Sequence, residues 1–344
     1  MLWWSWVAKL NFEPPWGANQ PRETGQQMME ILFVCDPLES FKIYKDSTFA
    51  MMREAQRRGH AVSTCEPRDL GWEHGGLVQA AVRSITLTGE AHTWFSQTNP
   101  AGETRALRSF AAVVMRKDPP FDNEYFYATH LLEQAEREGA QVFNKPRALR
   151  DHPEKLSILE FPAFIGPTLV TRDANAIRAF HALHRDIILK PLDGMGGMGI
   201  FRVREDGLNL GGIIETLNQD GAQTVMVQKF LPAIEHGDKR VLVIGGKPVP
   251  YCLARIPQGG EVRGNLAAGG KGVAQPLSAT DRHIAESLGP VLAQRGLLLV
   301  GLDVIGENLT EINVTSPTCF REITDQTGFD VAAMFMDALQ ESLS

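Results

Sequence analysis

The stretch Asp186–Val203 places the strongest constraint on the fold of this chain, because it joins an apolar strand to a second strand through a glycine-rich turn. Lys190 ends the first strand, and the turn contains Gly194, Gly196, Gly197 and Gly199. Glycines let backbone N–H groups approach an anion closely, and a nearby lysine adds a point charge for phosphate. The stretch predicts a phosphate-binding loop, against the alternative of a glycine-rich hairpin without a ligand.

The residues that follow the turn decide which kind of phosphate loop this is. Gly194, Gly196 and Gly199 satisfy G-x-G-x-x-G, but a dinucleotide-binding loop of that type must open a helix. Here residues 200–203 alternate apolar and polar as a strand does, and no Gly-Lys-Ser/Thr of a Walker A loop follows. The sequence therefore predicts a hairpin flap over phosphates.

The composition excludes several classes of protein. A chain of 344 residues is long enough for two or three domains. Its 34 basic and 41 acidic residues give a net charge of −7 without a basic block, which disfavours a nucleic-acid partner. The 4 cysteines form no C-x-x-C pair, as expected of free thiols in a reducing compartment. No apolar run approaches the roughly 20 residues of a membrane span, so we expect a cytoplasmic protein with no membrane partner.

Residues 1–28 differ in composition from the rest of the chain. Tryptophans, a Pro-Pro pair and a polar run fall here, without the basic start, long apolar core and cleavage site of a signal peptide. We interpret this segment as an extension outside the fold, from a start codon placed too far upstream. The alternative is a tail that binds a membrane interface.

Strands and helices alternate over residues 30–150. Strands are predicted at 31–35, 61–65, 111–115 and 141–144, and helices at 47–58 and 125–138. This alternation favours a parallel α/β layer, with residues 66–110 left unassigned.

Further strands are expected after the flap, with a Gly245-Gly246 turn between two of them. They lie at 224–230, 240–244, 248–254, 297–304 and 309–314, and a helix is expected at 284–294. Residues 257–272 contain many glycines and no periodic apolar residues, which indicates either a functional loop or a long linker.

Asp303, Glu311 and Asn313 interrupt otherwise apolar strands near the C-terminus. Glu311 and Asn313 are two residues apart, so a strand directs both to one face. Carboxylate and amide oxygens suit Mg²⁺, and acidic groups on apolar strands cost desolvation unless they have a partner. The trio predicts a magnesium site, against the alternative of polar residues on a solvent-facing surface.

Basic residues supply the complementary charge. Arginine suits a bidentate grip on carboxylate or phosphate, although each single arginine is more often a surface residue. No H-E-x-x-H or G-x-S-x-G motif occurs, so covalent hydrolase chemistry has no support. The candidates are Lys155, Lys190, Arg240, Arg255, Arg263 and Arg116, the last of which follows an apolar strand.

Five motifs resemble those of bacterial glutathione synthetase, a family of ATP-grasp ligases. They are MRKDPPFD (115–122), NKP (144–146), ILKPLDGMGG (188–197), the long run 242–270 and TEINVTSPTC (310–319). The resemblance runs from Ile31 to the C-terminus, is weak over 66–105 and 157–167, and is absent from the first 28 residues.

The resemblance implies an α/β fold (α+β overall) of the ATP-grasp type. Its domains would be an N-terminal parallel α/β substrate domain over 29–152, a central lid domain over 153–230 and a C-terminal catalytic domain over 231–344. It also implies a homo-oligomer, a tetramer by family resemblance.

The resemblance assigns roles to individual residues. ATP would be bound by Lys155, Lys190, Gly194, Met195, Gly196, Gly197, Gln228, Lys229, Leu231 and Asp238. The metal ligands would be Asp303, Glu311 and Asn313, and the catalytic arginines Arg240, Arg255 and Arg263. Arg116, Arg255, Arg263 and Asn313 would contact substrate.

The implied reaction uses ATP and Mg²⁺, which Mn²⁺ could replace, to join γ-glutamylcysteine and glycine through an acyl phosphate. Residues 257–272 would close over that intermediate and exclude water. Two alternatives stay open from the sequence. One is another ATP-grasp ligase, such as a D-alanine–D-alanine or amino-acid-to-peptide ligase; the other is a nucleotide-binding regulator with the same fold.

Overall fold

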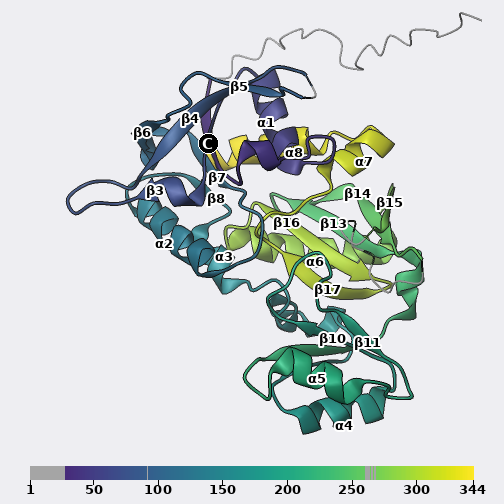
Figure 1. Cartoon of the computed structure of the whole chain (residues 1–344). Helices are drawn as coiled ribbons and strands as arrows, with labels where there is room; N and C mark the ends of the chain where they lie inside the picture. The colour runs from purple at the N-terminus through teal and green to yellow at the C-terminus, as the bar shows by residue number, and fades with distance from the viewer. Residues whose placement is uncertain (1–27, 91, 260–263, 265, 267–268) are drawn as a thin grey trace, which may run out of the picture.

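Three β-sheets form the frame of the protein in a computed structural model. The structure describes residues 28–344 except 91, 260–263, 265, 267 and 268. The first sheet lies at one end of the molecule, the second at the other, and the third between them (Figure 1).

The first sheet has strand order β3-β4-β2-β1-β7-β8, and β5 and β6 also pair with β4. β1, β2, β7 and β8 are parallel, which confirms the parallel layer expected here. The residues that the sequence left unassigned form the antiparallel strands β3 to β6. The bounds are β1 Glu30–Val34, β2 Ala61–Cys65, β3 Leu70–Gly71, β4 Gln79–Leu87, β5 Phe95–Gln97, β6 Glu103–Ala106, β7 Ala112–Met115 and β8 Val142–Phe143.

Helices α1 (Ser47–Arg57), α2 (Asn123–Arg137) and α3 (Pro146–Asp151) belong to this part of the chain. Two of them begin at a side-chain cap that satisfies a free backbone N–H of the first turn. Asp46 accepts from the N–H of Phe49, and Asp122 accepts from the N–H of Tyr125. The cap places the start of α2 directly after the loop that leaves β7.

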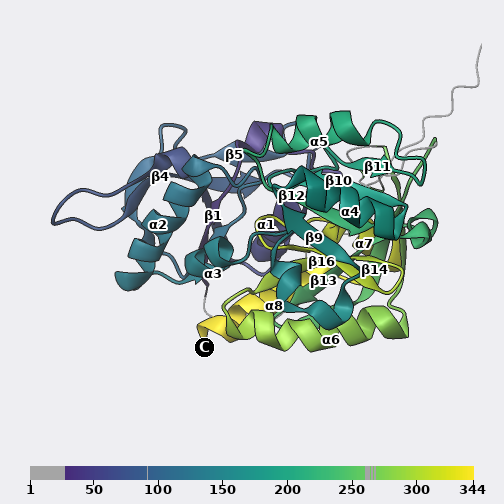
Figure 2. The same ribbon diagram turned by 90° about the horizontal axis from the view of Figure 1, so that it is seen from below.

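The second sheet is antiparallel with order β11-β10-β12-β9. Ile187 pairs with Val203 and Leu189 with Phe201, so the glycine-rich turn joins a hairpin, as predicted. Helices α4 and α5 lie on the outer side of this sheet (Figures 1 and 2). The bounds are β9 Thr168–Thr171, α4 Ala174–His184, β10 Ile187–Pro191, β11 Phe201–Val203, α5 Leu210–Asn218 and β12 Val225–Lys229.

The third sheet is also antiparallel, with order β15-β14-β13-β16-β17. Gly245 and Gly246 both have positive φ in the β13–β14 turn, a backbone shape that glycine adopts without strain, and this confirms the expected hairpin. The bounds are β13 Asp238–Ile244, β14 Lys247–Ile256, β15 Lys271–Pro276, α6 Ala279–Gln294, β16 Leu299–Ile305, β17 Asn308–Asn313, α7 Phe320–Thr327 and α8 Val331–Leu343.

The last helix returns to the first part of the chain. α8 lies beside α1, and Arg58 at the end of α1 donates to Asp337 and Gln340 of α8. Two large apolar cores each contain residues of both the first and the third sheet. A third core is confined to the second sheet and its helices. The first and third sheets therefore share a packed interior, which Met226 of β12 joins, and the other face of the second sheet has a core of its own.

Candidate active site

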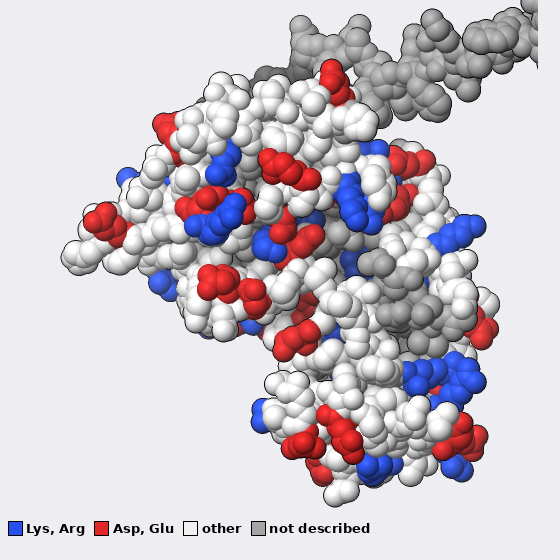
Figure 3. Space-filling view, in the orientation of Figure 1, with Lys and Arg blue, Asp and Glu red and all other residues white. Residues whose placement is uncertain are grey.

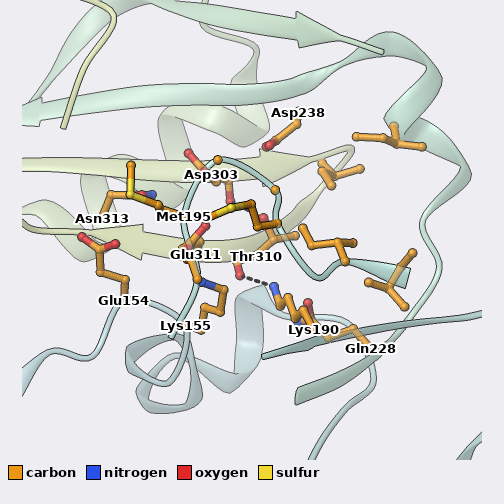
Figure 4. A pocket seen from close by; sticks show the side chains of 18 of the residues that line it. Glu154, Lys155, Lys190, Met195, Gln228, Asp238, Asp303, Thr310, Glu311 and Asn313 are labelled. Atoms are coloured by element: carbon orange, nitrogen blue, oxygen red, sulfur yellow. Dashed lines mark hydrogen bonds and ion pairs between the residues drawn. The ribbon is translucent and has the colours of Figure 1, made fainter. Parts of the chain in front are cut away.

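A pocket lies between the second and third sheets and brings most of the predicted site residues together (Figure 4). With its open mouth it encloses about 1070 Å³. All ten residues predicted to bind ATP line it, as do the three predicted metal ligands and Arg240. On the face of the molecule shown in Figure 3, basic and acidic side chains are interspersed without a large patch of one sign.

Two buried lysines line the pocket, each 6% exposed: Lys190 on β10 of the second sheet, and Lys155 in the segment between α3 and Ser157. Nζ of Lys190, on β10, donates to the carbonyl of Thr310 at 3.3 Å. Nζ of Lys155 donates to the carbonyl of Gly194 at 2.6 Å and lies 3.1 Å from Glu311. Burial lowers the pKa of Lys190, against the opposing effect of Glu311. Both ammonium groups are thus dehydrated and positioned to bind an anion.

The turn between β10 and β11 covers the same space. Gly196 and Gly197 have φ of +63° and +82°, conformations that a side chain would strain. The carbonyl of Gly194 is fixed by Lys155, which ties the turn to the lysine pair. The geometry is that of a flap whose backbone can approach phosphate oxygens.

The far wall of the pocket is mainly apolar. Gln228, Lys229 and Leu231 lie at the end of β12, and Gln228 Nε2 donates to Thr168 Oγ1 at 3.1 Å. The apolar lining between them could not be predicted from the sequence, because single apolar residues on strands are ordinary core residues. This surface suits an aromatic ring, and its missed members are Ile188, Phe230, Ile234 and Ile305.

The third sheet contributes a buried network of two arginines and two aspartates. Arg240 pairs with Asp303 at 2.6 Å, and Arg255 lies 2.8 Å from Asp303 and 2.5 Å from Asp238. The strand register produces these pairs, because Arg240 is opposite Asp303 and Asp238 is opposite Arg255. All four residues are at most 9% exposed.

The pKa values of the two carboxylates in this network are shifted in opposite directions. Burial alone would raise the pKa of Asp303, but Arg240 and Arg255 outweigh it and hold that pKa well below its usual value. Burial raises the pKa of Asp238 to about 6, although Arg255 acts against this. Oδ1 of Asp238 is buried and has no hydrogen-bond partner in the described part of the chain. That unsatisfied oxygen faces the pocket as an acceptor site for a ligand.

Glu311 and Asn313 both line the pocket from β17, and Glu311 is opposite Asp303 in the register with β16. Asn313 donates through Nδ2 to the carbonyl of Gly301 at 3.1 Å, which leaves its side-chain oxygen available. Within the described residues, no three His, Cys, Asp or Glu side chains gather as a preformed metal cage. An open set of oxygen donors is nevertheless what Mg²⁺ uses, because it keeps waters and phosphate oxygens as ligands.

Three predicted arginines differ in where the structure places them. Arg255 lies behind the pocket lining, in contact with Asp238 and Asp303. Arg116 does not line the pocket; it is 4% exposed at the end of β7, where Nε donates to Thr48 Oγ1 and Nη2 to the carbonyl of Pro317. Arg263 lies outside the described residues.

Glu154 is a site residue that the sequence analysis missed. Its Oε1 accepts from the N–H groups of Val314 and Thr315 and from the Thr315 hydroxyl, at 2.8 to 3.1 Å. Burial and then the charge of Glu311 raise its pKa. Its place directly before Lys155 was the signal in the sequence, but only the fold brings it to the end of β17.

Comparison with solved structures defines the class of fold. The D-cycloserine synthetase DcsG superposes with a TM-score of 0.63 at 16% identity, covering 91% of this chain and 100% of that one. The ATP-grasp ligase PsnB, solved with its minimal precursor, superposes with a TM-score of 0.59 at 19% identity, covering 91% and 99%. At these identities the likeness establishes the ATP-grasp fold.

Sequence comparison establishes the family. Family models described as the N-terminal domain and the ATP-grasp domain of prokaryotic glutathione synthetase match residues 29–150 and 154–328. The glutathione synthetase of Ralstonia nicotianae is 62% identical over 314 residues, covering 91% of this chain and 96% of the relative. That of Bordetella parapertussis is 57% identical over 318 residues, covering 91% and 99%. The chain belongs to the prokaryotic glutathione synthetase family.

None of the described helices is both long and apolar enough to cross a membrane.

Proposed function

We propose that this protein joins γ-glutamylcysteine to glycine with the cleavage of ATP, giving glutathione, ADP and phosphate through an acyl phosphate. One observation carries the proposal. In a single pocket, two buried lysines and a glycine flap face Arg240 and carboxylates of the third sheet, in a chain that both family models match. This arrangement suits the transfer of a phosphoryl group to a carboxylate.

The two sides of the pocket have separate tasks in this proposal. The base of ATP would lie on the apolar wall, and its phosphates would meet Lys155, Lys190 and the flap. Buried cations and backbone N–H groups can bind phosphate without reorganising water. Asp238, with its unsatisfied oxygen, would accept a hydrogen bond from the nucleotide.

Mg²⁺ would be held by Glu311, Asn313 and Asp303. The donor set fits a hard cation, because all three offer oxygen and the carboxylates of Glu311 and Asp303 lie on opposed residues of paired strands. When bound, the ion would neutralise charge on the transferring phosphoryl group. Asp303 is already neutralised by Arg240 and Arg255, so it is positioned in its ionised form.

The arginines would stabilise the charge that develops on the acyl phosphate. Arg240 lines the pocket and Arg255 lies directly behind it, and we assign Arg263 to the same role from its motif. The amine of glycine would then attack the acyl carbon and release phosphate. Neither step needs a protein nucleophile, so positioning and electrostatics would supply most of the rate. Closure of residues 257–272 would keep water from the acyl phosphate.

Several further statements belong to this proposal. The protein would be a cytoplasmic homotetramer, would accept Mn²⁺ in place of Mg²⁺, and would have no nucleic-acid or membrane partner. The domain boundaries would fall at 152/153 and 230/231. Residues 1–28 would lie outside the catalytic fold, so that a protein lacking them would keep its activity. Arg116 would contact substrate.

The test is phosphate release from ATP and Mg²⁺ with γ-glutamylcysteine and glycine omitted in turn. We expect release only when both are present, with glutathione as the product. Release with another carboxylate–amine pair, such as D-alanine, would instead indicate a different ATP-grasp ligase. ATP binding without turnover on any pair would point to a regulator.

A further inference from the structure

Arg202 lies beside the apolar wall of the pocket and has no part in the reaction proposed above. It is opposite Ile188 in the pairing of β10 with β11, and opposed residues of paired strands point to the same face of a sheet. Ile188 lines the pocket, whereas its neighbours Ile187 and Leu189 belong to the separate core on the other face. Arg202 is therefore on the pocket face of the second sheet, in its edge strand, although it is not itself part of the pocket lining.

The guanidinium of Arg202 stacks on the aromatic ring of Phe230. Its Cζ lies 3.4 Å from the centroid of that ring. Phe230 directly follows β12, is 9% exposed and lines the pocket as part of the apolar wall. A cation over an aromatic face is attracted by the negative charge that the ring presents there. The guanidinium therefore favours one orientation of a ring that borders the space for the base.

Asp186 holds the guanidinium in place. Nε and Nη2 of Arg202 donate to the two carboxylate oxygens of Asp186 at 2.9 and 2.6 Å. A bidentate pair of this kind fixes the plane of the guanidinium as well as its position. The carbonyl of Asp186 also accepts from the backbone N–H of Phe230 at 2.9 Å. Asp186 thus holds the backbone of Phe230 directly and its ring through Arg202.

A ring that is held before the ligand arrives binds it at a lower entropic cost. A side chain that can change rotamer loses that freedom when a ligand packs against it, and a side chain that is already fixed does not. The group formed by Asp186, Arg202 and Phe230 is separate from the cation on the same sheet that faces the phosphates, because Lys190 donates to the carbonyl of Thr310. Loss of the Arg202 guanidinium should therefore weaken contacts to the base without weakening contacts to phosphate.

We propose that Arg202, clamped by Asp186, is a positioning residue that holds the ring of Phe230 ready to stack on the base of ATP. This inference rests on the nucleotide site of the ligase proposed above and names the residue that prepares that site for the base. Arg202 acts through the ring and does not touch the nucleotide. Its contribution should therefore appear with any adenine nucleotide and be absent with a ligand that has no base.

The test is Arg202→Met, with Arg204→Met as the matched control, since Arg204 is exposed two residues further along the chain. Titration calorimetry of the full-length protein should show the Kd for ADP with Mg²⁺ raised about 5- to 30-fold in Arg202→Met. The Kd for inorganic tripolyphosphate should stay within about twofold. In steady-state assays the KM for ATP should rise by a similar factor while kcat stays within about twofold, and the control should match the wild type. Arg202→Lys keeps a cation and should recover part of the affinity for ADP.

A double-mutant cycle shows whether Arg202 acts through the ring. Phe230→Leu should itself raise the Kd for ADP, and adding Arg202→Met to it should cause no further loss. Asp186→Asn loosens the clamp and should give the same pattern with a smaller factor, which keeps the test available if Arg202→Met does not fold.

Three outcomes would overturn the inference. They are an unchanged Kd for ADP in Arg202→Met, an equal loss of affinity for tripolyphosphate, and additive losses in the double variant. The titrations need no turnover, so a wild type that binds ADP but forms no glutathione would overturn the ligase proposal alone.

Discussion

The two sides of the pocket differ in how they are supported. The second sheet has a small core of its own, built from residues such as Ile177, Leu189 and Ile214, and presents Lys190 and the glycine turn. The third sheet shares its cores with the first and presents a closed network of ion pairs. A side with a largely separate core, of which only Met226 joins the shared core, can move as a unit more easily than a side within the shared core. We infer that the second sheet closes on the nucleotide over a rigid third sheet.

Of the substitutions that test this difference between the two sides, Asp303→Asn should have the largest effect on stability and activity. It leaves two buried arginines without their shared carboxylate, so we expect a loss of about 3–5 kcal/mol in the free energy of unfolding, together with nearly all activity. Denaturant titration measures the loss. Asp337→Asn is the control, because its ion pair with Arg58 involves an aspartate that is 63% exposed and should change stability by less than about 1 kcal/mol. Equal losses of stability in the Asp303→Asn and Asp337→Asn variants would show that the buried network does not hold the third sheet rigid.

Asp238→Asn tests the same network through pH. The pKa of Asp238 in the folded protein is about 6, above the ordinary 3.8. The contribution of Asp238 to the free energy of unfolding is therefore complete below pH 4 and is lost as the pH rises through 6. The variant cannot ionise. Between pH 4 and 7, the free energy of unfolding of the variant should therefore rise relative to that of the wild type by up to about 3 kcal/mol. A pH-independent difference would mean that Arg255 holds Asp238 ionised throughout.

Glu311→Gln should affect activity alone. Glu311 is 20% exposed and pairs only with Lys155 in the described residues, so the fold should survive. Loss of the charge at the phosphoryl group should lower kcat about 100-fold. Steady-state phosphate release measures this, and Glu307→Gln, in the exposed turn before β17, should behave as wild type. Unchanged turnover would remove Glu311 from the metal site.

Lys190→Met tests the moving side and should have the smallest effect. The variant loses a charged hydrogen bond to phosphate, which should raise the KM for ATP about 10-fold. Stability should hold or rise, because burial already disfavours the charged lysine. Lys247→Met, at a lysine that is 74% exposed on β14, is the control. A loss of stability instead would indicate that Lys190 supports the fold.

Elements with a strong local pattern could be predicted from the sequence. The hairpin on either side of the glycine turn, the parallel strands β1, β2 and β7, and the Gly245-Gly246 turn all follow from apolar alternation and turn chemistry. Strands β3 to β6 could not be predicted, because their alternation is weak and they pair at the antiparallel edge of the sheet. The domain boundaries and the role of residues 1–28 stay predictions.

The site also has features that could be predicted from the sequence and features that could not. Residue type and spacing, with the resemblance, determined by themselves which lysines, glycines and carboxylates would meet at a nucleotide. Only the tertiary structure decided that Asp303 is shared by two arginines and that Asp238 keeps an unsatisfied oxygen. It also decided that Arg116 lies outside the pocket lining, with a hydroxyl and a carbonyl as its partners. The sequence pattern indicates which groups are present. Strand register and burial determine the partners and the charge of these groups, and both depend on residues far apart in the chain.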